Sequence, residues 1–391
     1  MCPEITQIEI VPFTYPVEDA RLDLSTQKLV YAPGETHERQ VQSIRIHTDT
    51  GMTGEYVGGS GPAAAQVELC ADYLIGEDPL KREKHWNVIR EMLRKYDRMG
   101  LGMIDIALWD FAGKHAGSPI HELLGTYRDR LPAYASTYFA QTESGLDSPE
   151  KFAAFAESCF ERGFDAFKTH TWCENGDYDI DKEKELIRAV GEQVGDQMAL
   201  MHDPVGKYDT LADALEVGRM CDEYEYFWYE DPYRDTGQSQ HGHRKLRELM
   251  DTPLLLTELV RGLEPTIDFV ANDATDFARA DPEWDGGITG AMKAARAAEG
   301  LGVDIEYHLA GPAQRHCMAA TRNSNFYELG LIHPESDLPH SEFPVYKGEY
   351  TDSVAAVDED GTVSVPTDPG LGVEYDWDYI MKNSLKTTVY E

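Results

Sequence analysis

The chain has 391 residues, of which 41% are hydrophobic, enough for two domains or for one large barrel with an appendage. Its 71 Asp and Glu residues, against 35 Lys and Arg residues, give a formal net charge of −36. Such a surface repels phosphates and anionic lipids, so neither nucleic acids nor membranes are expected partners. The acidic residues are spread along the chain rather than gathered in a tail, which argues against disorder.

Six cysteines, at positions 2, 70, 159, 173, 221 and 317, are scattered without a Cys-x-x-Cys pair. At this chain length the pattern predicts reduced, mostly buried thiols. The N-terminus, MCPEITQIEI, lacks the basic stretch and the apolar core of a signal peptide. No uncharged apolar run approaches the roughly 18 residues that a membrane span needs. We therefore expect a soluble, cytoplasmic protein.

The first third of the chain has the pattern of an α+β unit. Alternating apolar residues predict strands at 5–14 and 42–56, and the polar segment 17–38 between them is expected to be a long irregular loop. Helical patterns dominate from about 63 to 125, and the apolar residues of the stretch 102–117 fall on one helical face. Gly125 and Pro132 mark the end of this unit.

From residue 132 onward, short apolar runs alternate with helical stretches. The runs are AYASTYF, FDAFKTH, MALMHD, YFWYED, LLLTE, DFARAD, VDIEYH and FYELG. The intervening helical patterns include 150–162, 181–193, 211–223, 243–250 and 289–300. Eight strands joined by seven crossovers predict an α/β fold, a modified (β/α)7β TIM-type barrel.

No convincing eighth helix follows the last strand, and the tail has strand and turn patterns. We expect this tail to return to the first unit. The predicted organisation is an N-terminal α+β capping domain at 1–131, the barrel at 132–348, and a C-terminal segment at 349–391 that completes the capping domain.

Ionisable residues recur near the ends of the predicted barrel strands. They are His170, Asp203, Glu230, Glu258, Asp281, His308 and Glu328, at spacings of 33, 27, 28, 23, 27 and 20 residues. A single acid after a strand is usually a helix cap or a loop charge. Glutamate is not a favoured cap, however, and the repetition on consecutive strands favours one shared site. In a parallel barrel all strand C-termini open on one face, where active sites are built.

Asp203, Glu230 and Glu258 would repel one another at this mouth unless a cation neutralised them. A set of oxygen ligands suits a hard divalent cation, and Mg²⁺ keeps positions open for substrate oxygens. Zinc is less expected because it prefers His or Cys ligands. The sequence therefore predicts a Mg²⁺ ion held by these three carboxylates.

Two pairs of residues flank the predicted metal site. Lys168 and His170 are two positions apart, so in an extended strand they point the same way. On the other flank, Asp281 can orient the ring of His308 and raise its basicity. Considered without its neighbours, His308 fits a buried core histidine as well as it fits a catalytic residue. Base-like groups on both flanks favour proton transfer at carbon, with the metal neutralising the enediolate formed beside a substrate carboxylate.

With these residues in place, the chain resembles the enolase superfamily, and within it the mandelate racemase/muconate lactonizing enzyme family. The motifs FKTH, MHDP, WYEDP, LLTE, ADPEWDGGITG and EYHLAGP match its barrel motifs in order. The stretch IDIALWDFAGKHAGSPIHELLG is similar to the end of its capping domain. The resemblance covers nearly the whole chain, and DGGITG between the dyad Asp and His is its most specific element.

The resemblance implies roles for individual residues. Asp203, Glu230 and Glu258 would be the Mg²⁺ ligands, and Asp281 with His308 a base dyad. Lys168 would touch the substrate carboxylate, and Glu328 matches an acid that can hydrogen-bond the enediolate in some members. The segments 17–38 and 55–61 would close the site and choose the substrate.

One position departs from the subgroup's pattern. His170 stands where these relatives often carry the second lysine of Lys-x-Lys. A neutral imidazole can still exchange protons near pH 7, but its reach is shorter than that of lysine. Relatives of this kind usually form symmetric oligomers, so a homo-oligomer is expected. The dispersed acidic excess also resembles that of proteins from halophiles.

These residues lead us to expect a Mg²⁺-dependent dehydratase of a small-molecule sugar acid, a lyase. His308 or His170 would abstract the proton α to the carboxylate, and a second acid would help the β-hydroxide leave as water. The alternative is a racemase or epimerase of a 2-hydroxy acid on the same site. A cycloisomerase is less expected because those relatives usually place a lysine on the sixth strand. A non-catalytic sugar-acid binding protein is the remaining possibility.

Overall fold

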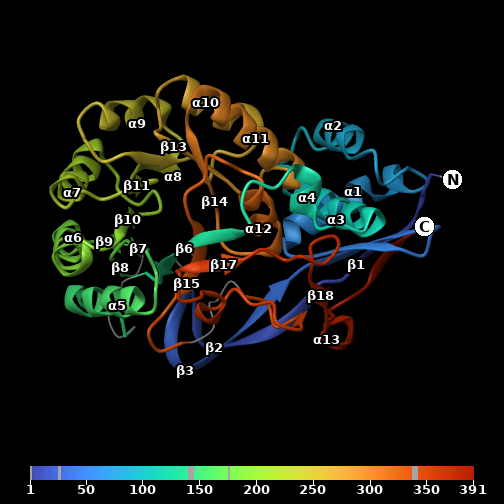
Figure 1. Ribbon diagram of the computed structural model, residues 1–391, viewed down its shortest axis with the longest axis horizontal. Coiled ribbons are helices and arrows are strands. Elements are labelled where there is room, and N and C mark those ends of the chain that lie inside the picture. The colour runs from blue at the N-terminus through green and yellow to red at the C-terminus, as the bar shows by residue number, and fades with distance from the viewer. Residues whose placement is uncertain (1, 25–27, 140–144, 175–176, 337–341) are drawn as a thin grey trace.

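The computed structural model describes residues 2–24, 28–139, 145–174, 177–336 and 342–391. Figure 1 shows a barrel with helices on its outside next to a smaller α+β unit, in which the two chain termini lie close together. No helix in these ranges is long and apolar enough to cross a membrane. Among the cysteines whose side chains are described, all are free thiols and all but Cys2 are buried, as predicted.

The smaller unit is built on an antiparallel sheet with the strand order β19-β1-β4-β5. These strands are β19 (Thr388–Tyr390), β1 (Ile5–Ile10), β4 (Ser43–Thr48) and β5 (Thr53–Val57). Ile5, Ile8 and Ile10 of β1 are buried in one cluster with residues of the helices α1 (Gly61–Leu74), α2 (Arg82–Met92), α3 (Met99–Ala116) and α4 (Ile120–Leu124). Because β19 pairs with β1, the tail does return to the N-terminal unit.

The segment expected as an irregular loop at 17–38 is instead largely a β-hairpin. Strand β2 (Phe13–Asp23) pairs antiparallel with β3 (Lys28–Val41), while residues 25–27 lie outside the described ranges. The alternation was hard to recognise because the register shifts at Asp19, which has a left-handed backbone. The single strand expected at 5–14 is also divided, since β1 ends at Ile10 and Pro12 precedes β2.

The barrel strands follow the order β14-β13-β12-β11-β10-β7-β6-β15, and each neighbouring pair is parallel. The strands are β6 (Arg130–Thr137), β7 (Ala166–His170), β10 (Ala199–Asp203), β11 (Trp228–Glu230), β12 (Leu254–Leu256), β13 (Phe277–Ala280), β14 (Asp304–Tyr307) and β15 (Tyr327–Ile332). The Glu328 side chain accepts a 2.8 Å hydrogen bond from the Leu309 N–H and thereby joins the two ends of this order. The eight predicted strands and the TIM-type barrel are confirmed.

Helices cover the outside of the barrel, as Figure 1 shows. They are α5 (Pro149–Glu161), α6 (Ile180–Val194), α7 (Leu211–Glu223), α8 (Arg234–Gly237), α9 (Gln240–Arg247), α10 (Leu263–Ala271), α11 (Gly287–Leu301) and α12 (Pro312–Ala319). In the tail, β17 (Thr362–Ser364) pairs with β6 before the chain continues through α13 (Trp377–Lys382) to β19. The tail therefore contacts the barrel as well as the N-terminal sheet.

An apolar layer fills the barrel interior beneath the site. Ala166, Met201 and Trp228 belong to one buried cluster with Tyr134 and Leu255. The first three precede Lys168, Asp203 and Glu230 by two residues and so share their inner face. This buried apolar layer lies below the ionisable residues.

Candidate active site

The predicted site residues come from successive strand ends. Asp203 and Glu230 are the last residues of β10 and β11, and Glu258 follows β12 by two residues. Asp281 and His308 come directly after β13 and β14, and Lys168 and His170 lie on β7. Glu328 departs from the expected position at a strand end. It is the second residue of β15, and this strand continues to Ile332.

The three carboxylates predicted to hold a metal lie together in space. One ligand oxygen from each of Asp203, Glu230 and Glu258 lies within 4.8 Å of the others. Burial raises the pKa of Glu230 to about 7, although Arg279 and Lys168 pull it down. Burial and the charge of Glu258 also raise the pKa of the adjacent Asp231 well above its usual range. A divalent cation would relieve this repulsion, and donors that are all oxygen fit magnesium.

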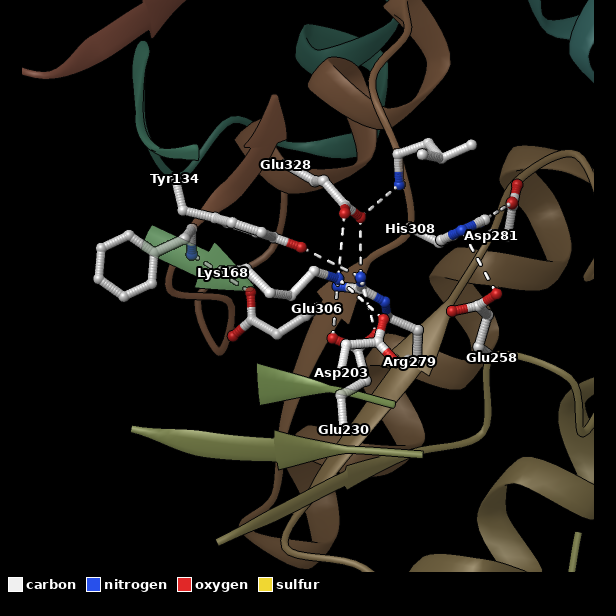
Figure 2. Close-up of polar contacts among 12 residues, drawn as sticks. Tyr134, Lys168, Asp203, Glu230, Glu258, Arg279, Asp281, Glu306, His308 and Glu328 are labelled. Carbon is white, nitrogen blue, oxygen red and sulfur yellow. Dashed lines mark hydrogen bonds and ion pairs between the residues drawn. The ribbon is translucent and has the colours of Figure 1, made fainter. Parts of the chain in front are cut away.

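The Lys168 ammonium is only 1% exposed and lies among carboxylates, as Figure 2 shows. Its Nζ is 2.9 Å from Glu230 Oε2, 3.1 Å from Glu328 Oε1 and 3.4 Å from Asp203 Oδ2. Burial alone would lower the pKa of Lys168, but Glu230 and Glu328 raise it well above its usual value. The lysine therefore stays charged inside the barrel.

Sequence reasoning missed a second buried cation, Arg279. Its Nη2 lies 2.9 Å from Glu230 Oε1 and 2.7 Å from Glu328 Oε2, and donates to the Tyr134 hydroxyl at 3.1 Å. Arg279 precedes Asp281 by two residues on β13, so strand alternation was the available signal. Lys168 and Arg279 together hold the pKa of Glu328 well below its usual range despite burial.

The two histidines have matching arrangements. His170 Nδ1 donates to the Thr137 carbonyl at 2.7 Å, and its Nε2 lies 3.3 Å from Asp203 Oδ2. His308 Nδ1 lies 2.7 Å from Asp281 Oδ2, and its Nε2 lies 3.5 Å from Glu258 Oε1. Each ring thus has its Nδ1 tied to the protein and its Nε2 directed at the carboxylate cluster. Since β7 and β14 stand on opposite sides of β10–β12 in the strand order, the rings flank the cluster.

The electrostatic environment favours a proton on His308. Burial lowers the pKa of His308, but Glu258 and Asp281 more than compensate and raise it to about 9. The Asp281 carboxylate and the Glu258 carboxylate face its two ring nitrogens (Figure 2). A cation bound to Glu258 would remove part of this effect and make the neutral, basic form of the ring more accessible.

A cavity of 450 Å³ opens above these residues, a size suited to a small-molecule ligand. The barrel lines it with Lys168, His170, Asp203, Glu258, His308 and Glu328. The hairpin β2–β3 supplies the facing wall, including His37 and Arg39. The turn at 55–61, expected to close the site, does not line this cavity; its Tyr56 hydroxyl instead donates to Glu283 at 2.8 Å.

Comparisons with known proteins agree over most of the chain. The family model of the mandelate racemase/muconate lactonizing enzyme N-terminal domain matches residues 20–125, and the enolase C-terminal domain-like model matches residues 151–379. A D-galactarolactone cycloisomerase of Agrobacterium fabrum is 28% identical, covering 86% of this chain and 89% of its own. An L-talarate/galactarate dehydratase of Salmonella typhimurium is 28% identical, covering 80% and 77%.

A solved structure is also closely similar. The crystal structure of D-glucarate dehydratase from Agrobacterium tumefaciens complexed with magnesium superposes with a TM-score of 0.86 at 29% identity. The match covers 98% of this chain and 99% of that one. The similarity therefore includes both the barrel and the smaller unit.

Proposed function

The chain belongs to the mandelate racemase/muconate lactonizing enzyme family of the enolase superfamily, and from this premise we propose that it is a magnesium-dependent hydro-lyase acting on a sugar acid. Sugar-acid dehydratases are among its relatives, and one of them was crystallised with magnesium. The observation that carries the proposal is the carboxylate cluster flanked by two imidazole Nε2 atoms.

We assign Asp203, Glu230 and Glu258 as the magnesium ligands. Their oxygens converge within 4.8 Å, and the accumulated negative charge favours a cation there. When bound, Mg²⁺ would supply positive charge to the substrate carboxylate as the enediolate forms. Lys168, which also lines the cavity, binds and polarises the same end of the substrate. Glu328 is held as a carboxylate by Lys168 and Arg279, so it positions the lysine rather than donating a hydrogen bond to the enediolate.

The two histidines divide the proton transfers between them. One imidazole, His308 or His170, removes the proton α to the carboxylate with its Nε2, and the C–H electrons form the enediolate. The enediolate then collapses, and these electrons form the α,β double bond as the β-hydroxyl group departs. The other imidazole, protonated, gives its proton to the β-hydroxyl group, which leaves as water. Asp281 and the Thr137 carbonyl hold the two Nδ1–H groups, so each ring keeps its orientation. The resulting enol tautomerises to a 2-keto-3-deoxy acid.

A racemase or epimerase of a 2-hydroxy acid is the second candidate, because two flanking bases are what a two-sided proton transfer requires. Exchange of the α-proton for solvent deuterium without loss of water would favour it. One relative is a cycloisomerase, so cycloisomerisation is the third reaction that the same screen tests.

We also propose that residues 1–131 and 349–391 form the capping domain over a barrel at 132–348, which the pairing of β1 with β19 supports. We propose a cytoplasmic protein on the basis of its free, mostly buried thiols, and a salt-adapted cell on the basis of its acidic composition. We also propose a homo-oligomer, because relatives of this kind usually form symmetric oligomers.

The test is a screen of the purified protein, with Mg²⁺ at high salt, against mono- and diacid sugars. We expect a 2-keto product from at least one acid. His308→Asn should lower turnover by about 10²–10⁴-fold and Glu230→Gln should abolish it. His241→Asn changes an exposed histidine on α9 and serves as the control. Full activity in purified His308→Asn would refute the assignment.

A further inference from the structure

A second cavity, of 520 Å³, lies between α2 and α3 of the smaller unit and the loops that follow β12 and β13. Figure 1 shows this junction, where α2 approaches α11. Its lining includes Trp86, Arg90, Arg98, Arg261, Trp284 and Gly286. Trp284 is shared with the active-site cavity, but no carboxylate of the metal cluster and neither catalytic histidine lines this one. The two cavities are therefore separate spaces on either side of one tryptophan.

Three arginines line this cavity in a chain where acidic residues outnumber basic ones by two to one. Arg90 is paired with Glu264. Within the described ranges, by contrast, Arg98 and Arg261 form no salt bridge, and the Nε of Arg98 is buried without a hydrogen-bond partner. Arg261 Nη1 lies against the Met99 sulfur at 2.7 Å, a weak acceptor. Two guanidinium groups thus retain donors for a ligand.

The acids that line the cavity are engaged by their own chain. Asp97 Oδ1 accepts hydrogen bonds from Gln66 Nε2 and from the Met99 N–H. Asp285 accepts from the Gly262 N–H and the Asp281 N–H, both at 2.8 Å. Backbone and amide donors thus bind these carboxylates, and in the part of the chain that the structure describes neither carboxylate forms a salt bridge with Arg98 or Arg261.

Three helices begin at the wall of this cavity. Arg98 has a φ of 67°, a left-handed conformation that is uncommon for a residue with a side chain. It caps α3, while Gly262 and Gly286 cap α10 and α11, and none of the three caps makes a side-chain hydrogen bond to its helix. Helix N-termini carry partial positive charge, but the Met99 N–H of α3 and the Thr289 N–H of α11 already donate to Asp97 and Asp105, so the two arginines are the cationic groups offered to a ligand.

We propose that this cavity binds a small dianion, of the phosphate or dicarboxylate class, between Arg98 and Arg261. The indoles of Trp86 and Trp284 form apolar walls beside it. Arg261 lies over the Trp284 ring at 4.5 Å, and the same ring lies 4.8 Å from His308. A bound anion would therefore hold Trp284 in place next to a catalytic ring. This inference does not depend on which reaction the active site performs.

The test is calorimetric titration of the full-length, Mg²⁺-loaded protein with sulfate, and separately with malonate, at an ionic strength held constant with KCl. We expect one site that Arg98→Gln and Arg261→Gln each weaken by about tenfold or more. Arg322→Gln, which removes one exposed positive charge from another surface, should leave binding unchanged. Arg98→Lys keeps the charge and should retain part of the affinity, which separates anion binding from loss of fold.

Binding of sulfate alone would assign the phosphate class, and binding of malonate alone the dicarboxylate class; either supports the site. Absence of binding by both anions would overturn the proposal. Binding that survives both arginine variants but is lost in Lys168→Met would place the anion in the catalytic cavity and also overturn it. Self-association that Arg98→Gln abolishes would show that a second copy of the chain fills the cavity. That result would also overturn the proposal.

Discussion

Replacing Arg279 by methionine should strongly destabilise the barrel. The guanidinium is 0% exposed and lies 2.9 Å from Glu230 Oε1 and 2.7 Å from Glu328 Oε2. Methionine retains much of the aliphatic volume but removes the charge, so two buried carboxylates lose a partner. Lys168 stays as the other cation beside them.

The expected loss follows from this burial. Removing one partner of a buried ion pair costs about 3–5 kcal/mol, because the remaining charge is left in the interior without compensation. That is a large share of the roughly 5–15 kcal/mol by which domains are stable. The exposed pair Arg322–Glu299, with side chains 57% and 29% exposed, should contribute far less to stability, because solvent screens its charges.

Urea unfolding at fixed salt measures this difference, with Arg322→Met as the matched control. We expect a smaller loss for Arg279→Met in saturating Mg²⁺ than in EDTA, because a cation beside Glu230 replaces part of the missing charge. Arg279→Met combined with Glu328→Gln should recover part of the stability, since it removes one of the stranded charges.

A free energy of unfolding for Arg279→Met in EDTA within about 1 kcal/mol of the wild type, at an unchanged denaturant slope, would refute this reasoning. It would mean that Glu230 and Glu328 are neutral or solvated in the folded protein.

Other measurements test the charge distribution around the site. In EDTA the free energy of unfolding should fall as the pH rises from 6.5 to about 9, because folded His308 keeps a proton that the unfolded chain has released. The variant His308→Asn should show a weaker dependence on pH. Arg39→Met, which removes a cation from the wall supplied by β3, should raise KM for the best acid by about tenfold and leave kcat within about twofold; an equal fall in kcat would contradict that role. Added KCl, from about 0.1 to 2 M, should raise the unfolding midpoint by screening repulsion among 71 acidic residues, and an unchanged midpoint would count against salt adaptation.

The barrel could be predicted because its signals are local. Each strand is a short apolar run, and the βα repeat returns every 20 to 33 residues at the ionisable positions. Asp203, Glu230 and Glu258 could be placed at one mouth because parallel strands end on the same face. The hairpin β2–β3 was missed because the shift at Asp19 breaks the alternation that identifies a strand.

Composition, periodicity and the spacing of acids by themselves determined the fold class, the strand order along the chain and the candidate metal ligands. Only the tertiary structure decided how the buried charges are paired. Arg279 meets Glu328 across 49 residues of sequence, and His170 is oriented by the Thr137 carbonyl on a neighbouring strand. The wall that β3 adds to the cavity likewise depends on how the smaller unit packs on the barrel. Such pairings depend on distance and burial in space, which local sequence patterns do not encode.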